Sequence, residues 1–156
     1  MTLSKMAVPA APPGRRLRDR VLVVTEDPSF IRRVRLVAEA EGATVTACLG
    51  PAASPCLLDE NESCALASRC RVVIVESPPG GNFRYHLKDV SAGAYAECLQ
   101  RAHPGSYVMF IPSLAELSGP TGEVAVVNDR GESVHLLKWI LRSLRISKDA
   151  PERSKR

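Results

Sequence analysis

Paired cysteines and long apolar runs are absent from this chain, and each absence excludes a class of protein. The five cysteines include no C-x-x-C pair, so a zinc site built from neighbouring thiolates is not expected. No apolar stretch approaches the roughly 18 residues of a membrane span. No G-x-G-x-x-G or G-x-x-x-x-G-K-[ST] motif occurs, so a nucleotide would lack its usual phosphate cradle.

The beginning of the chain also lacks the apolar segment of a secretory signal peptide. We therefore expect a cytoplasmic protein without a membrane segment, whose cysteines act as small hydrophobic residues in a reducing compartment. Aromatic residues make up 4% of the chain against 45% for all hydrophobic types, so aliphatic side chains must fill most of the core. The length of 156 residues suits one domain of ordinary size.

The formal net charge of +4 comes from the two ends of the chain. Residues 1–20 carry a net charge of +4 and residues 146–156 a net charge of +2, which leaves about −2 for the residues between them. The pattern predicts a disordered basic leader over 1–19, a domain over 20–146 and a disordered tail over 147–156. The basic leader could contact nucleic-acid phosphates. No aromatic residues interleave with its arginines, however, so we expect the leader to act as a solubilising tail. A nucleic-acid partner is therefore not expected.

Between the two ends, short apolar runs typical of buried strands alternate with segments of helical periodicity. Asp27 and Pro28 supply an N-cap and a first-turn proline for the first helix, and Gly42 ends it. The expected strands cover residues 21–24, 43–48, 72–75, 107–111 and 124–127, and the remaining helices cover about 52–68, 87–102 and 132–146. This alternation predicts an α/β fold with a parallel sheet and helices on both faces, because parallel strands need crossover connections.

In a sheet of this kind the functional site lies at the carboxyl ends of the strands. The residues that follow the expected strands are mostly acidic or hydroxyl-bearing, and the candidates for a site are Thr25, Glu26, Asp27, Glu76, Ser113, Asn128 and Asp129. Two stretches at these positions, VLVVTEDPSF and RVVIVESPPGG, resemble the first and third strands of the receiver domain of two-component response regulators. The resemblance spans roughly residues 20–146. It implies a flavodoxin-like (CheY-like) five-stranded parallel sheet, with a shortened fourth helix because few residues separate the last two strands.

A working receiver has an acidic pair that binds magnesium, an aspartate that accepts phosphate, a hydroxyl residue and a lysine. By the resemblance, the acidic pair falls on Thr25 and Glu26 and the phosphoacceptor falls on Glu76, whose extra methylene displaces the in-line geometry of phosphoryl transfer. The hydroxyl position falls at Ile111 or Pro112, with Ser113 next. The lysine position falls near Asn128 or Asp129, so no cation is expected in the pocket. The resemblance therefore implies a degenerate pocket that is not phosphorylated.

Two interpretations of Glu76 remain open. Its carboxylate either imitates a phosphorylated aspartate permanently or is simply tolerated at a solvated strand end. The second is preferred, because the cation and hydroxyl that would sense the charge are missing from the expected positions. The carboxylates could also gather around a hard cation, although such groups more often stay solvated.

The leading hypothesis is a non-enzymatic pseudo-receiver without a cofactor, which works as a regulatory protein-interaction module in signal transduction. The alternative is a small-molecule or metal-binding α/β domain that uses the crevice at the strand ends. In the last helix, Val134, Leu137, Leu141 and Leu144 form a stripe that should face the sheet. Leu136, Trp139 and Ile140 are the candidate interface residues, for a protein partner or a second copy of the chain, unless a neighbouring loop over residues 113–122 covers Trp139.

Overall fold

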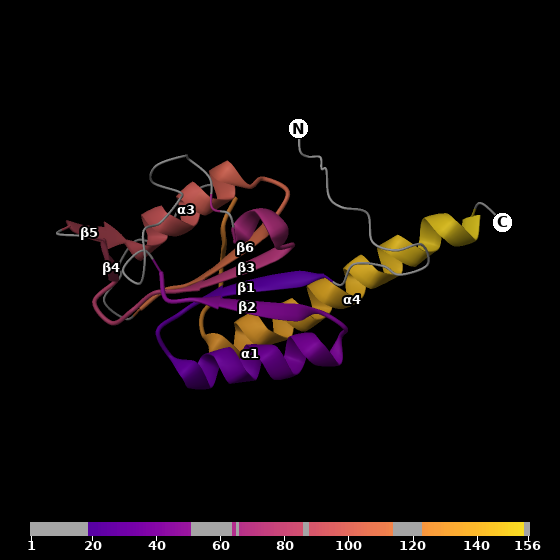
Figure 1. Cartoon of the computed structure of the whole chain (residues 1–156), viewed down its shortest axis with the longest axis horizontal. Coiled ribbons are helices and arrows are strands. Elements are labelled where there is room, and N and C mark those ends of the chain that lie inside the picture. Colours follow the sequence, from indigo (N-terminus) through magenta and orange to yellow (C-terminus); the bar gives the residue numbers. More distant parts are fainter. Residues whose placement is uncertain (1–18, 51–63, 65, 86–87, 114–122, 155–156) are drawn as a thin grey trace.

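The computed structural model describes residues 19–50, 64, 66–85, 88–113 and 123–154, which form an α/β unit (Figure 1). In chain order the elements are β1 (Arg20–Val24), α1 (Pro28–Ala40), β2 (Thr44–Cys48), the 3₁₀ helix η1 (Ala67–Arg69), β3 (Val72–Glu76), β4 (Asn82–Tyr85), β5 (Lys88–Ser91), α3 (Ala92–Ala102), β6 (Tyr107–Ile111), β7 (Ala125–Val126) and α4 (Arg130–Ser154). None of the helices in these ranges is both long enough and apolar enough to cross a membrane.

The main sheet has five parallel strands in the order β2-β1-β3-β6-β7, which confirms the flavodoxin-like α/β fold predicted from the sequence. Its central strands are apolar at nearly every position because both of their faces are covered. The chain changes direction across the sheet between β1 and β3, so the carboxyl ends of these two strands border the crevice in which such folds place their sites.

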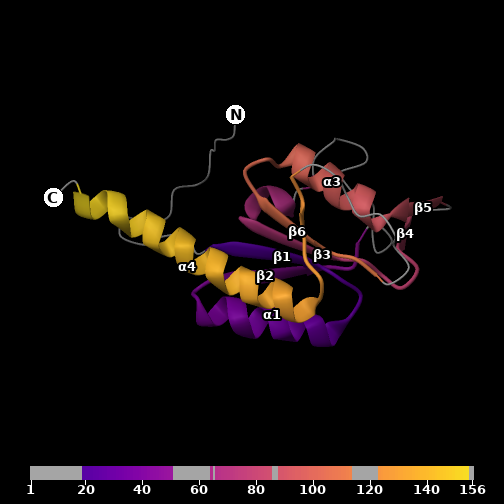
Figure 2. The ribbon, with the colours of Figure 1, turned by 180° about the vertical axis from the view of Figure 1, so that it is seen from behind.

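The sheet divides the core into two layers (Figures 1 and 2). Alternate residues of β1 point to opposite faces, so Val21 and Val23 pack under α1 and α4, while Leu22 and Val24 pack under α3 and η1. Helices α1 and α4 lie side by side on one face, and α3 covers the other. Both faces of the sheet are therefore covered by helices, as the sequence predicted.

Helix α1 begins where the sequence indicated. The Asp27 side chain accepts a hydrogen bond from the Ser29 amide (2.9 Å), and Pro28 occupies the first turn. The buried face consists of Phe30, Val34 and Ala38. These contacts fix the start of α1 directly beside the carboxyl end of β1, and so they position Asp27 for the site described below.

One predicted helix begins too early. Residues 88–91, expected near the start of a helix, form strand β5, which pairs antiparallel with β4, and α3 begins at Ala92 with Ser91 as its N-cap. Gly80 and Gly81 have φ of +91° and +87°, which only glycine adopts easily, and they turn the chain into this hairpin. Phe83 then points inward, edge-on to Tyr95 with a centroid distance of 5.3 Å. Burial of Phe83 in the core overrode the helical spacing that the sequence offered.

The closing helix is longer than expected. Helix α4 continues to Ser154, so residues 147–154, predicted to be a disordered tail, are helical, and the helix extends past the end of α1 and of the sheet (Figures 1 and 2). Extending a helix that is already anchored adds hydrogen bonds without a new nucleation step, although Pro151 has no N–H to donate. Strand β7 is shorter than its predicted range of 124–127. The leader up to residue 18, most of the predicted 52–68 helix and the region of the shortened fourth helix lie outside the described residues.

Candidate functional site

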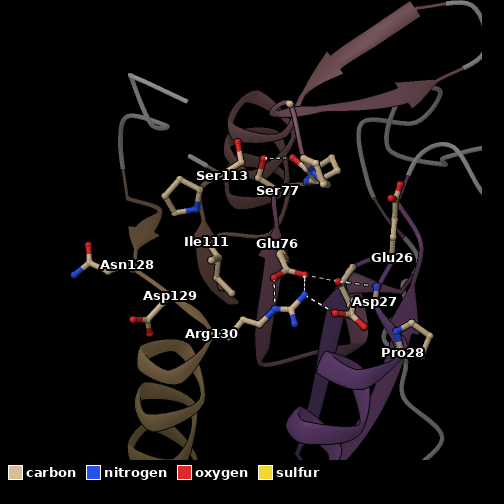
Figure 3. Close-up of a pocket in the computed structure, with 15 residues that line it drawn as sticks. Glu26, Asp27, Pro28, Glu76, Ser77, Ile111, Ser113, Asn128, Asp129 and Arg130 are labelled. Atoms are coloured by element: carbon tan, nitrogen blue, oxygen red, sulfur yellow. Dashed lines mark hydrogen bonds and ion pairs between the residues drawn. The ribbon is translucent and has the colours of Figure 1, made fainter. Parts of the chain in front are cut away.

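An open pocket of about 840 Å³ lies at the carboxyl ends of β1, β3 and β6 and at the start of α4 (Figure 3). All seven candidate site residues named from the sequence line it. The side chains nevertheless do not form one constellation. Four residues are joined by hydrogen bonds and ion pairs, and the other candidates have separate roles.

Glu76 is at the centre of the bonded group. It is the last residue of β3, and its side chain is 16% exposed. Arg130 Nε donates to Glu76 Oε2 (2.5 Å) and Arg130 Nη2 donates to Glu76 Oε1 (2.9 Å), a bidentate pairing of guanidinium and carboxylate. The hydroxyl of Thr25, a buried residue after β1, donates to Glu76 Oε1 at 2.6 Å. Both carboxylate oxygens of Glu76 are thus engaged within the protein.

Asp27 joins the same group while it caps α1. Its Oδ1 accepts hydrogen bonds from the amide and hydroxyl of Ser29, and its Oδ2 lies 2.8 Å from Arg130 Nη2. The hydrogen bonds from Ser29, followed by the one from Arg130, lower the pKa of Asp27 from 3.8 to about 2. The Asp27 amide in turn donates to Thr25 Oγ1 (3.2 Å), which orients the hydroxyl toward Glu76.

Arg130 is the first residue of α4, a position where a positive charge faces the positive end of the helix dipole. Two carboxylates compensate for this placement, and the hydrogen bond that Arg130 donates to Glu76 is the main cause of the raised pKa of Arg130. The guanidinium carbon also lies 4.9 Å from the centroid of the buried Phe30 ring, in a cation–π arrangement. The side chain is therefore held from three sides, by β3, by the start of α1 and by the Phe30 ring.

Asn128 and Asp129 form hydrogen bonds with the first turn of α4 and not with Glu76. The Asp129 side chain accepts a hydrogen bond from the Glu132 amide (2.7 Å), and the Glu132 side chain accepts one from the Asn128 amide (2.5 Å). This arrangement resembles a capping box, except that the Glu132 side chain reaches the amide of Asn128, one residue before Asp129. The side chain of Asn128 points away from Glu76 (Figure 3).

The remaining two candidates are also apart from the bonded group. Glu26 is exposed, and its carboxylate extends away from Arg130 (Figure 3). The Ser113 hydroxyl is buried and has no hydrogen-bond partner within the described residues. Of the seven candidates, the structure therefore brings together Thr25, Asp27 and Glu76.

Sequence reasoning missed the residue that organises the pocket. The expectation that no cation would face Glu76 is wrong, because Arg130, directly after the two positions considered, reaches it from the helix. The hydroxyl that contacts Glu76 is also present, but it comes from Thr25 on the β1 side instead of the β6 end. One signal was available: an arginine in the first turn of a helix is unfavourable unless carboxylates lie nearby, and Asp27 and Glu76 were both expected at this edge.

The arrangement limits what the pocket can do chemically. A carboxylate whose two oxygens accept three charge-assisted or hydroxyl hydrogen bonds is a poor nucleophile toward a phosphoryl donor. Within the described part of the chain, no group of three or more His, Cys, Asp or Glu side chains is placed to hold a metal ion. The charged groups of the site are therefore paired with one another, although the pocket itself is open to solvent.

The three candidate interface residues differ in exposure. Trp139 is 63% exposed on the outer side of α4, as its helical position predicted. Leu136 is partly buried against the core under α4. Ile140 is 7% exposed and belongs to that core, so its assignment to an interface is corrected, because the helix turns it toward the sheet beside Leu137 and Leu141.

Comparison with known proteins supplies no family for the chain: no family model, no curated protein and no solved structure matches it significantly.

Proposed function

We propose that this protein is a phosphorylation-independent pseudo-receiver, a cytoplasmic regulatory module that acts by binding a protein partner or a second copy of itself. The observation that carries the proposal is the state of Glu76. It stands at the end of the central strand, where the resemblance to receivers puts the phosphoacceptor, and Arg130 and Thr25 engage both of its oxygens.

The Glu76–Arg130 pair favours the interpretation that Glu76 permanently imitates a phosphorylated aspartate, which the sequence alone made the less preferred one. A lone carboxylate at a strand end would be solvated and would fix nothing. Here the carboxylate binds the first residue of α4 and an N-capping residue of α1 through a single guanidinium. The positions of the two helices that cover one face of the sheet therefore depend on this charge, with no phosphate required.

The surface of the last strand and last helix supports a binding role. Val126 on β7 is 51% exposed and Trp139 on α4 is 63% exposed. Large exposed apolar side chains, and tryptophan above all, concentrate at the centres of protein interfaces. Val126 is in register with Phe110 and so faces the α3 side of the sheet, whereas α4 covers the other side, and we therefore assign partner binding to the outer side of α4.

The proposal is tested by measuring binding under conditions that would phosphorylate a receiver. Wild-type protein and the Trp139→Ala variant are compared by sedimentation velocity and by quantitative capture of partners from the native host. Both are run with and without Mg²⁺ and acetyl phosphate. We expect binding to be unchanged by the phosphodonor and reduced by the substitution. A dependence on the phosphodonor would refute the proposal.

The alternative, a small-molecule or metal-binding domain, is favoured by the open pocket of about 840 Å³. Within the described residues, however, Arg130 already pairs with both Asp27 and Glu76, so these two carboxylates are not free to bind a ligand. A thermal-shift series with Mg²⁺, Mn²⁺ and nucleotides distinguishes the two. A saturable rise in melting temperature that Glu76→Gln abolishes would favour the alternative.

A further inference from the structure

The two large hydrophobic side chains most exposed among the described residues lie on the neighbouring helices α1 and α4. Leu36 of α1 is 75% exposed and Trp139 of α4 is 63% exposed. Val34 and Leu137 precede them by two residues and are fully buried. Because two residues of a helix correspond to a rotation of about 200°, Leu36 and Trp139 both point away from the sheet.

These two side chains also stand at the same level along their helices. Asp27 and Arg130 pair at the starts of α1 and α4 (2.8 Å), and the two helices run side by side from there (Figures 1 and 2). Leu36 lies nine residues after Asp27, and Trp139 lies nine residues after Arg130. Both are therefore roughly 14 Å along the layer that the two helices form.

Leu36 is flanked along α1 by two opposite charges. Arg32 precedes it by four residues and Glu39 follows it by three, so the three side chains form one exposed stripe on the helix. Neither charged side chain forms an ion pair with another described residue. Both charges are therefore available to a second molecule. We call Arg32, Leu36, Glu39 and Trp139 the outer face.

The stripe on α1 is complementary to itself. Leu36 stands at the midpoint between Arg32 and Glu39 to within half a residue. A second copy of α1, laid antiparallel across this midpoint, brings Leu36 against Leu36 and each Arg32 opposite a Glu39 of the other copy. Arg35, beside the stripe, comes within reach of the same glutamate. A twofold axis thus uses one patch twice, as symmetric dimers do.

We infer that the outer face binds a second copy of this chain, with the two α1 helices antiparallel about Leu36 and with Trp139 in the same contact. The inference rests on the proposed function and names its partner. The choice of a second copy follows from charge complementarity, because one stripe supplies both members of each ion pair. A face of two short helices is smaller than a standard interface, so we expect a weak dimer that depends on protein concentration.

The first test follows the molar mass of the full-length protein by sedimentation equilibrium, from about 10 µM to about 1 mM. We expect the wild type to shift from monomer toward dimer. Leu36→Ser should raise the dissociation constant about tenfold or more, because the symmetric dimer loses the side chain twice. The control is Leu66→Ser, which removes an exposed leucine beside η1 on the other face of the sheet and should change the constant less than about threefold.

Charge reversal tests the antiparallel register. Arg32→Glu and Glu39→Arg should each weaken the dimer about tenfold, because each variant places two pairs of like charges opposite each other. Mixed in equal amounts, the two variants should form a heterodimer, since every glutamate of one then faces an arginine of the other. Arg101→Glu, at an exposed position of α3, is the control and should dimerise like the wild type. Circular dichroism establishes that each variant is folded.

Three results would overturn the inference. They are a wild type that stays monomeric throughout, equal dissociation constants for Leu36→Ser and Leu66→Ser, and no heterodimer from the mixed variants. A monomeric wild type that captures a host protein through Trp139 would overturn the inference and leave the proposed function standing. A dimer that forms only with acetyl phosphate, and that Leu36→Ser disrupts, would support the interface and refute the proposed function.

Discussion

At the scale of single residues, Arg130 determines the character of the pocket. Its partner Glu76 is 16% exposed, so removing the guanidinium leaves a mostly buried carboxylate without its cation. Arg130 itself is 36% exposed, and water screens part of the loss. The Glu76–Arg130 pair therefore contributes more than a surface ion pair and less than a fully buried one.

We predict that Arg130→Met lowers the free energy of unfolding by about 2 kcal/mol, because methionine keeps an apolar stem near Phe30 and removes the charge. Arg130→Lys should cost less than this, since lysine keeps the charge without the bidentate geometry. Urea titration measures both. Arg35→Met, at an exposed position of α1, is the control and should stay within about 0.5 kcal/mol. Equal effects of Arg130→Met and the control would mean that the pair contributes nothing.

The pKa of Asp27 gives a prediction for the dependence of stability on pH. The pKa of Asp27 in the folded state is about 2, below its usual value of 3.8. Above pH 3.8 the ionised side chain therefore contributes its full stabilisation to the folded state. That contribution is lost progressively as the pH falls from about 4 toward 2. Asp27→Asn should therefore be less stable than wild type near pH 6, and the two should converge at low pH. Melting temperatures across this range test the prediction, and parallel curves would contradict it.

At the scale of elements, α4 combines three roles. Its first residue closes the pocket, its inner stripe packs against the sheet, and its outer side presents Trp139. A shift of the N-terminus of α4 would move Trp139 as well, because a packed helix moves as a rigid body. The pocket and the proposed interface thus share one helix.

Two adjacent residues of α4, one exposed and one buried, allow the proposed interface to be distinguished from the core by substitution. We predict that Trp139→Ala costs less than about 1 kcal/mol of stability and weakens self-association or partner binding, since the side chain is 63% exposed. Ile140→Ala should cost about 2–4 kcal/mol, because its side chain is 7% exposed and its removal leaves a cavity. Sedimentation and denaturant titration distinguish the two effects. A stability loss of several kcal/mol for Trp139→Ala with unchanged association would place the tryptophan in the core.

The elements that the sequence predicted well are those specified locally. The apolar runs of β1, β3 and β6 and the Asp27–Pro28 start of α1 carry their own signals. The β4–β5 hairpin and the Glu76–Arg130 pair depend on contacts between distant parts of the chain, because Phe83 is buried against Tyr95 and Arg130 reaches back across the sheet. The hydrophobic periodicity of a sequence cannot show such contacts. The sequence therefore predicted most residues of the pocket but not Arg130, the cation that pairs with Glu76.

At the scale of the whole molecule, the two ends of the sheet differ in charge. The carboxyl end holds two carboxylates that pair with Arg130, and at the amino end Arg20 lies beside Arg71, which pairs with Asp19. A receiver that works by phosphorylation needs a free carboxylate and a loosely held cation at its carboxyl end. In this protein Arg130 and Thr25 engage both oxygens of Glu76, which is why we propose that the arrangement of its helices does not depend on a phosphodonor.

Intact-mass spectrometry tests this central claim most directly. The full-length protein is incubated with acetyl phosphate and Mg²⁺, with a working receiver treated in parallel as the positive control. We predict that the mass of the wild type is unchanged, because both oxygens of Glu76 are bound by Arg130 and Thr25. The addition of one phosphoryl group to the wild type, absent from the Glu76→Ala variant, would contradict the account.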